Sequence, residues 1–98
     1  MITSKQMVAD ITEYVSKHGG RMGDWYAGIA ADARARLFHD HGVNEAGGAW
    51  IYRICRTASQ ARATECHLLR LGMRGGSGYV DTTSKCVYAY KINSVTRE

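Results

Sequence analysis

Residues suited to phosphate chemistry lie close together between Tyr26 and Arg36. Apolar and polar positions alternate over 24–30, which predicts a strand with Tyr26 and Gly28 on one face. Asp32 can cap a following helix, because its carboxylate can accept hydrogen bonds from amides two or three residues on. Arg36 then lies one turn into that helix, near its positive end. An anion bound there would lie beside Tyr26 and within reach of the arginine fork, which can donate two parallel hydrogen bonds.

A carboxylate on an apolar helix face is the second candidate. Over 58–71 the apolar spacing predicts a helix, and Glu65 falls on the same broad side as Leu68. An ionised carboxylate buried without a partner costs several kcal/mol and normally finds a cation or a metal. A structural interpretation stays open, in which Glu65 reaches solvent or pairs with Arg62 or Arg36.

The densest run of glycines, residues 72–78, surrounds Arg74. Backbone amides in such a run can cradle a phosphate, with Arg74 adding charge. The run matches no known nucleotide-binding motif, and a simple connection is the alternative interpretation.

Taken in order, these pieces resemble the GIY-YIG nuclease family. The run 26–29, Tyr-Ala-Gly-Ile, is similar to the second half of the signature. Arg36, followed by a leucine and then by His41, resembles the arginine helix, and Glu65 falls in a segment similar to the helix whose glutamate holds the metal. The resemblance covers roughly residues 24–72.

The strand that carries the first half of the signature does not precede residue 24, because residues 4–18 have the spacing of a helix. A tyrosine-alternating strand near the C-terminus, with Tyr88 and Tyr90, is a candidate replacement. We therefore expect 85–92 to pair with 24–30, which would complete the sheet in permuted order and bring Tyr88 or Tyr90 beside Tyr26.

The resemblance implies roles for Glu65, Arg36 and Tyr26, and nine residues in all are candidates for the site. Glu65 would hold Mg²⁺, Arg36 would stabilise charge on the phosphate, and Tyr26 would orient or deprotonate water. To deprotonate water at neutral pH, a tyrosine needs a nearby cation that lowers its pKa from the ordinary value of about 10. The further catalytic candidates are Tyr88, Tyr90 and His41, and the nucleic-acid-binding candidates are Gly28, Arg34 and Arg74. For His41 the alternative is a plain histidine at a helix end.

The elements that must position these residues form an α+β domain. We expect one small, three-stranded, mainly antiparallel sheet flanked by three helices. The expected strands are 24–30, 49–55 and 85–92, and the expected helices are 4–17, 33–41 and 58–71. The alternation in 49–55 leaves both faces partly apolar, which indicates a central strand. The polar residues after 92 are expected to fray.

Composition agrees with a single domain over residues 1–98. The net charge is +4 and the calculated pI is about 9.2, which favours polyanionic partners. No apolar run is long enough for a signal peptide or a membrane span, so we expect a cytoplasmic protein. The three cysteines lack the spacing of a zinc site and are expected to be buried, reduced thiols.

Two functions fit these observations. The first is a Mg²⁺-dependent nuclease, or a nucleic-acid-binding domain derived from one. The second is a non-catalytic inhibitor or interaction protein that blocks a nucleic acid or a protein that handles one, as small basic proteins of phages and other mobile genetic elements do. Metal binding separates the two, because an inhibitor does not need an ordered Glu65 site.

Overall fold

A computed structural model describes residues 3–75 and 84–97. The elements in chain order are α1 (Ser4–His18), the 3₁₀ turn η1 (Met22–Asp24), β1 (Trp25–Ala30), the π-helix η2 (Ala35–Asp40), β2 (Trp50–Ile54), α2 (Ala58–Arg70) and β3 (Cys86–Lys91). The predicted α+β class is confirmed, and each predicted strand lies within one residue of the observed one.

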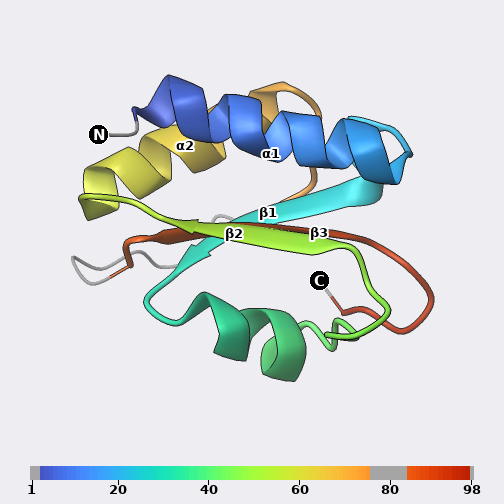
Figure 1. The fold of residues 1–98 in the computed structure, drawn as a ribbon. Helices are drawn as coiled ribbons and strands as arrows, with labels where there is room; N and C mark the ends of the chain where they lie inside the picture. Colours follow the sequence, from blue (N-terminus) through green and yellow to red (C-terminus); the bar gives the residue numbers. More distant parts are fainter. Residues whose placement is uncertain (1–2, 76–83, 98) are drawn as a thin grey trace.

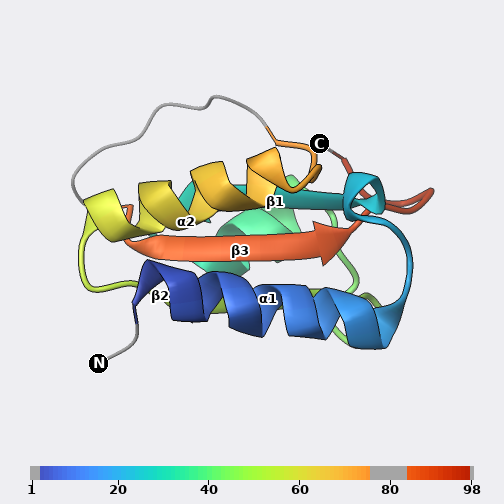
Figure 2. The same cartoon turned by 90° about the horizontal axis from the view of Figure 1, so that it is seen from above.

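Three layers make up the fold. Figure 1 shows α1 and α2 on one face of the sheet and η2 with the C-terminal segment on the other. Seen from above, α2 lies over β1 and α1 over β2, with β3 between them (Figure 2). Each face therefore has its own core.

The core under α1 and α2 is aliphatic apart from Trp25, and includes Ile11, Leu68 and Val87. The core under η2 is aromatic, with Tyr88 and Tyr90 fully buried around Leu37. The candidate site residues of the sheet lie on this second face.

The sheet order is β1-β3-β2, with both pairs antiparallel. β3 pairs with β1, and Tyr90 is the direct partner of Tyr26, so the expected pairing of the C-terminal strand with 24–30 is confirmed. The expectation that 49–55 is central was wrong. β3 takes that place because its first five residues are all buried, whereas β2 carries the half-buried Arg53 and the exposed Ile54.

Local signals explain where the helices begin. Thr3 caps α1 by accepting from the amide of Gln6, and Thr57 caps α2 by accepting from the amide of Gln60 at 3.0 Å. The Gln60 side chain reaches back to the amide of Arg56, one residue before this cap.

Asp32 caps the next helix as expected, with Oδ1 accepting from the amide of Ala35 at 3.1 Å. The predicted helix 33–41 is only one turn of α-helix before it widens into the π-helix η2. Here the amide of His41 donates to the carbonyl of Arg36 at 2.9 Å, an i→i+5 bond.

Both outer edges of the sheet are partly occupied by other groups. Arg74 forms a parallel bridge with Tyr26 at the edge of β1. On β2 the odd-numbered residues bond to β3, so the main-chain groups of Trp50 and Tyr52 point outward. The Trp50 amide donates to the hydroxyl of Tyr14, and the Tyr52 carbonyl accepts from Arg53.

The segment after β3 does not fray over its described residues. A turn joins Asn93 and Thr96, and the amide of Arg97 donates to the carbonyl of His41 at 2.6 Å. Both main-chain and side-chain groups hold this segment, since the Arg97 guanidinium also donates to the carbonyl of His39. None of the helices in the described ranges is long and apolar enough to cross a membrane.

Candidate active site

The candidate site is built around Tyr88 on the η2 face of β3. Tyr88 is 1% exposed, and its cross-strand partner on β1 is Gly28. A Cβ at Gly28 would lie 2.5 Å from the Tyr88 hydroxyl oxygen, so the ring lies directly over this glycine. Gly28 therefore makes room for Tyr88, a role that its place in the sequence did not indicate.

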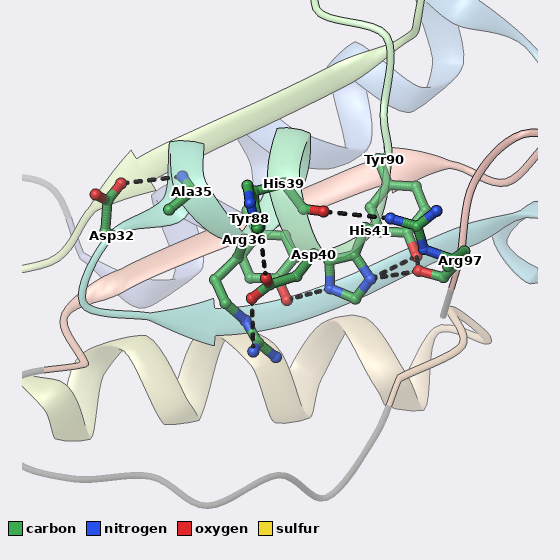
Figure 3. Close-up of polar contacts among 9 residues, drawn as sticks. All are labelled: Asp32, Ala35, Arg36, His39, Asp40, His41, Tyr88, Tyr90 and Arg97. Atoms are coloured by element: carbon green, nitrogen blue, oxygen red, sulfur yellow. Dashed lines mark hydrogen bonds and ion pairs between the residues drawn. The ribbon is translucent and has the colours of Figure 1, made fainter.

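Arg36 comes to Tyr88 from η2. Its guanidinium is near enough to the Tyr88 hydroxyl for the interaction between them to be the main reason that the pKa of Arg36 is raised. Nη1 also pairs with Asp40 Oδ2 at 3.1 Å, and about half of the Arg36 side chain stays exposed (Figure 3). Arg36 thus has one partner in the core and a surface open to an anion.

Behind Tyr88 lies His41, which is 4% exposed. Its Nε2 lies 2.8 Å from the Tyr88 hydroxyl oxygen, and its Nδ1 lies 2.6 Å from the carbonyl oxygen of Arg97 (Figure 3). The Tyr90 hydroxyl lies 3.1 Å from both His41 Nδ1 and the same carbonyl. The predicted candidates His41, Tyr88 and Tyr90 therefore form one buried polar cluster.

Tyr26 is the half-buried member of the aromatic group. Its ring centroid lies 4.8 Å from that of His41, 5.3 Å from that of Tyr90 and 6.5 Å from that of Tyr88. The structure thus brings Tyr26 together with every aromatic candidate predicted from the sequence.

Burial controls the proton of Tyr88. It raises the pKa of the hydroxyl to about 12; Arg36 opposes this rise, and the charges of Tyr26 and Glu65 add to it. Tyr88 is therefore protonated at neutral pH and cannot act there as a phenolate base.

Glu65 lies on α2, half-buried, and its charge is near enough to Tyr88 to affect the pKa of that hydroxyl. Burial raises the pKa of Glu65 itself, and Arg62 partly opposes this. Within the described ranges no ion pair reaches its carboxylate, so the expected pairing with Arg62 or Arg36 is absent as a direct contact. A half-buried carboxylate oxygen without a cation suits Mg²⁺, which keeps several of its waters and takes few protein ligands.

The described residues contain no group of three or more histidine, cysteine, aspartate or glutamate side chains that could hold a metal. A magnesium site here would therefore rest on Glu65 with water. The predicted reduced thiols are present: Cys55 and Cys86 are buried, but Cys66 is exposed on α2, contrary to expectation.

Two predicted nucleic-acid contacts lie apart from Arg36. Arg34 pairs with Glu45 and lies 5.1 Å from the centroid of the Phe38 ring. Arg74 is held through its main chain at the edge of β1, where its amide donates to the carbonyl of Trp25 at 2.8 Å. The start of the glycine run therefore extends the sheet edge, and residues 76–78 lie outside the described part of the chain.

A separate groove of about 240 Å³ lies on the opposite face, between α1 and β2. Its charges pair with each other: Arg53 Nε lies 3.8 Å from Asp10, and Lys17 Nζ lies 3.4 Å from Glu13. This groove offers no excess of positive charge to a phosphate.

Sequence reasoning missed two members of the site. Asp40 had a local signal, because it lies four residues after Arg36 on a predicted helix. Arg97 had none, since it contributes a main-chain carbonyl. No family model, curated protein or solved structure matches the chain.

Proposed function

We propose that this chain binds nucleic-acid phosphate beside Tyr88 and cleaves the phosphodiester with the help of Mg²⁺, as a GIY-YIG-like domain in permuted order. The observation that supports this proposal is the position of Tyr88, whose hydroxyl lies 2.8 Å from His41 Nε2 and whose ring centroid lies 6.5 Å from that of Tyr26. Arg36 and Glu65 are near enough to affect the pKa of the same hydroxyl. These are the residue types that the resemblance requires, and they come from β1, η2, α2 and β3.

Each residue has a separate task in this proposal. Arg36 binds the phosphate and stabilises the negative charge that builds up on it. Tyr88 holds Arg36 in place, and Tyr26, the more accessible tyrosine, orients the attacking water. Glu65 would hold Mg²⁺, which supplies Lewis-acid stabilisation of the phosphate oxygens.

Nucleic-acid cleavage tests the proposal. Single- and double-stranded DNA and RNA are incubated with the chain in Mg²⁺ or in EDTA, together with Glu65→Gln and Arg36→Gln. The matched control is Glu13→Gln, which changes an exposed carboxylate on α1. We expect Mg²⁺-dependent cleavage by the parent and the control and at least ~10²-fold less by the two site variants. Equal cleavage by all four proteins, or cleavage that persists in EDTA, would contradict these roles.

One observation favours the second candidate, a non-catalytic protein that binds and blocks a nucleic acid or its protein partner. Tyr88 is buried and keeps its proton at neutral pH, so it cannot serve as the activated base of a nuclease. Binding to nucleic acid without cleavage, and without any gain in stability from Mg²⁺, would support this alternative.

A further inference from the structure

Three groups are joined in series across the η2 face by hydrogen bonds: the Tyr88 hydroxyl, the His41 imidazole and the main-chain carbonyl of Arg97. The Arg36 guanidinium interacts with the hydroxyl at the other end, and we call these four groups the buried chain. The two middle groups are buried, and about half of the Arg36 side chain at one end is exposed. Figure 3 shows the four groups side by side. The carbonyl at the other end lies at 2.6 Å from His41.

The carbonyl end fixes the direction of both hydrogen bonds in the buried chain, because a carbonyl can only accept. His41 must therefore donate from Nδ1 to Arg97, which leaves a lone pair on Nε2 when the imidazole is neutral. Tyr88 donates its proton to that lone pair, which leaves the lone pairs of its oxygen for the interaction with Arg36.

We infer that the main-chain carbonyl of Arg97 is a positioning group for Arg36: it fixes the Nδ1–H tautomer of His41 and so orients the Tyr88 hydroxyl toward Arg36. The C-terminal segment is thus part of the anion site. This inference rests on the proposed function only in taking Arg36 as the group that binds phosphate.

The segment that carries this carbonyl is held in place by several bonds. The amide of Arg97 donates to the carbonyl of His41, and its guanidinium donates to the carbonyl of His39 at 3.3 Å. Gly42, with φ +69°, lies against it: a Cβ there would lie 3.2 Å from the carbonyl oxygen of Val95. The carbonyl therefore has a defined position from which it can orient His41.

The Tyr88 hydroxyl depends on His41 as its acceptor because it is buried. The proton of Tyr88 has no access to water, since the residue is 1% exposed, and a buried hydroxyl without an acceptor is costly. The other tautomer of His41 would place a second N–H against Tyr88 and leave the Tyr88 proton without that acceptor. Only the Nδ1–H tautomer satisfies both residues.

The test compares three proteins by nitrogen NMR of the His41 ring and by titration with inorganic phosphate. Removal of residues 97 and 98 deletes the carbonyl, whereas Arg97→Ala keeps it and removes only the guanidinium. We expect the Nδ1–H tautomer in the parent and in Arg97→Ala. In the truncated chain we expect loss of this single tautomer and about fivefold weaker phosphate binding, the factor that corresponds to one neutral hydrogen bond.

Tyr88→Phe keeps the inference testable if the truncated chain does not fold. This variant interrupts the buried chain in the middle, so His41 should keep its tautomer while phosphate binding weakens. An Nε2–H tautomer in the parent, or unchanged phosphate affinity in both variants, would overturn the inference. Phosphate binding without nucleic-acid cleavage would instead contradict the nuclease proposal and leave this inference standing.

Discussion

Gly28 and Tyr88 share one space on the η2 face of the sheet: a Cβ at Gly28 would lie 2.5 Å from the Tyr88 hydroxyl oxygen and 2.6 Å from Cζ. The two residues are direct cross-strand partners. A tyrosine can reach Arg36 and His41 from β3 only because β1 has no side chain at this point.

Gly28→Ala should displace the Tyr88 ring and break its contacts with Arg36 and His41. Overpacking of a filled core typically costs about 1–3 kcal/mol in the free energy of unfolding, which urea denaturation measures. Gly23→Ala is the control, because the nearest atom to a Cβ there is 3.9 Å away. Equal stability of the two variants would show that the ring can move aside freely.

Arg36→Gln should reduce the salt dependence of nucleic-acid binding. Each lost phosphate contact lowers the slope of log affinity against log salt by about one. Arg53→Gln on the opposite face, where Arg53 lies 3.8 Å from Asp10, should leave the slope unchanged. Fluorescence anisotropy at several salt concentrations measures the slope, and an affinity indifferent to salt would indicate a protein partner instead.

Arg34→Gln provides a second salt series, since the sequence also predicts a phosphate contact for Arg34. Its charge is already paired with Glu45, so we expect a smaller change in slope than for Arg36→Gln. A decrease in slope as large as that caused by Arg36→Gln would mean that nucleic acid displaces Glu45 from Arg34.

Glu65→Gln should raise the melting temperature of the metal-free protein at neutral pH. Burial raises the pKa of Glu65 in the folded state above its value in the unfolded chain. The protonated side chain therefore stabilises the fold at low pH, and this stabilisation is lost as the pH rises through the folded-state pKa. At pH 7 the charged carboxylate therefore destabilises the folded state, and glutamine removes that charge. Thermal melts at pH 7 check this, with Glu13→Gln as the control.

The same melts in millimolar Mg²⁺ test the metal site. The parent should gain stability from the ion and Glu65→Gln should not, because a ligand that binds only the folded state stabilises it. A parent indifferent to Mg²⁺ that also cuts no nucleic acid would leave the binding protein as the function.

Alkaline pH should destabilise the fold through Tyr88. Its pKa is raised from about 10 to about 12, so the unfolded chain loses this proton first and stability falls between these values. At pH 11 the loss of this proton from the unfolded chain should lower the free energy of unfolding by about 1 kcal/mol. Urea denaturation at pH 9 and 11 should show a smaller loss for Tyr88→Phe than for the parent, with Tyr52→Phe on the edge strand as control.

Local chemistry made much of the fold predictable. Thr57 with Gln60, and Asp32 before η2, mark helix starts through side chains that bond to nearby amides. The pairing of β3 with β1 followed from the need for a tyrosine strand beside Tyr26. The helix-start signals lie within a few residues, whereas the strand pairing was expected from the resemblance, in which a tyrosine strand lies beside the strand of Tyr26.

The rest depended on contacts that the sequence does not encode locally. The order of the strands was missed, because Arg53 on β2 finds Asp10 on α1 and so tolerates an edge position. Arg97 acts through a carbonyl that every residue has, and only the folded chain brings it to His41.

The π-helix η2 places Arg36 and His41 on one face although the two are five positions apart. Four residues lie between them, and the amide of His41 bonds to the carbonyl of Arg36 one wide turn below. With the ~100° per residue of an α-helix, His41 would point about 140° away from Arg36. Replacements that rewind this stretch as a regular α-helix should therefore turn the imidazole away from Tyr88, even with every interacting side chain retained. The winding of the backbone, and not only the identity of the side chains, brings Arg36 and His41 together.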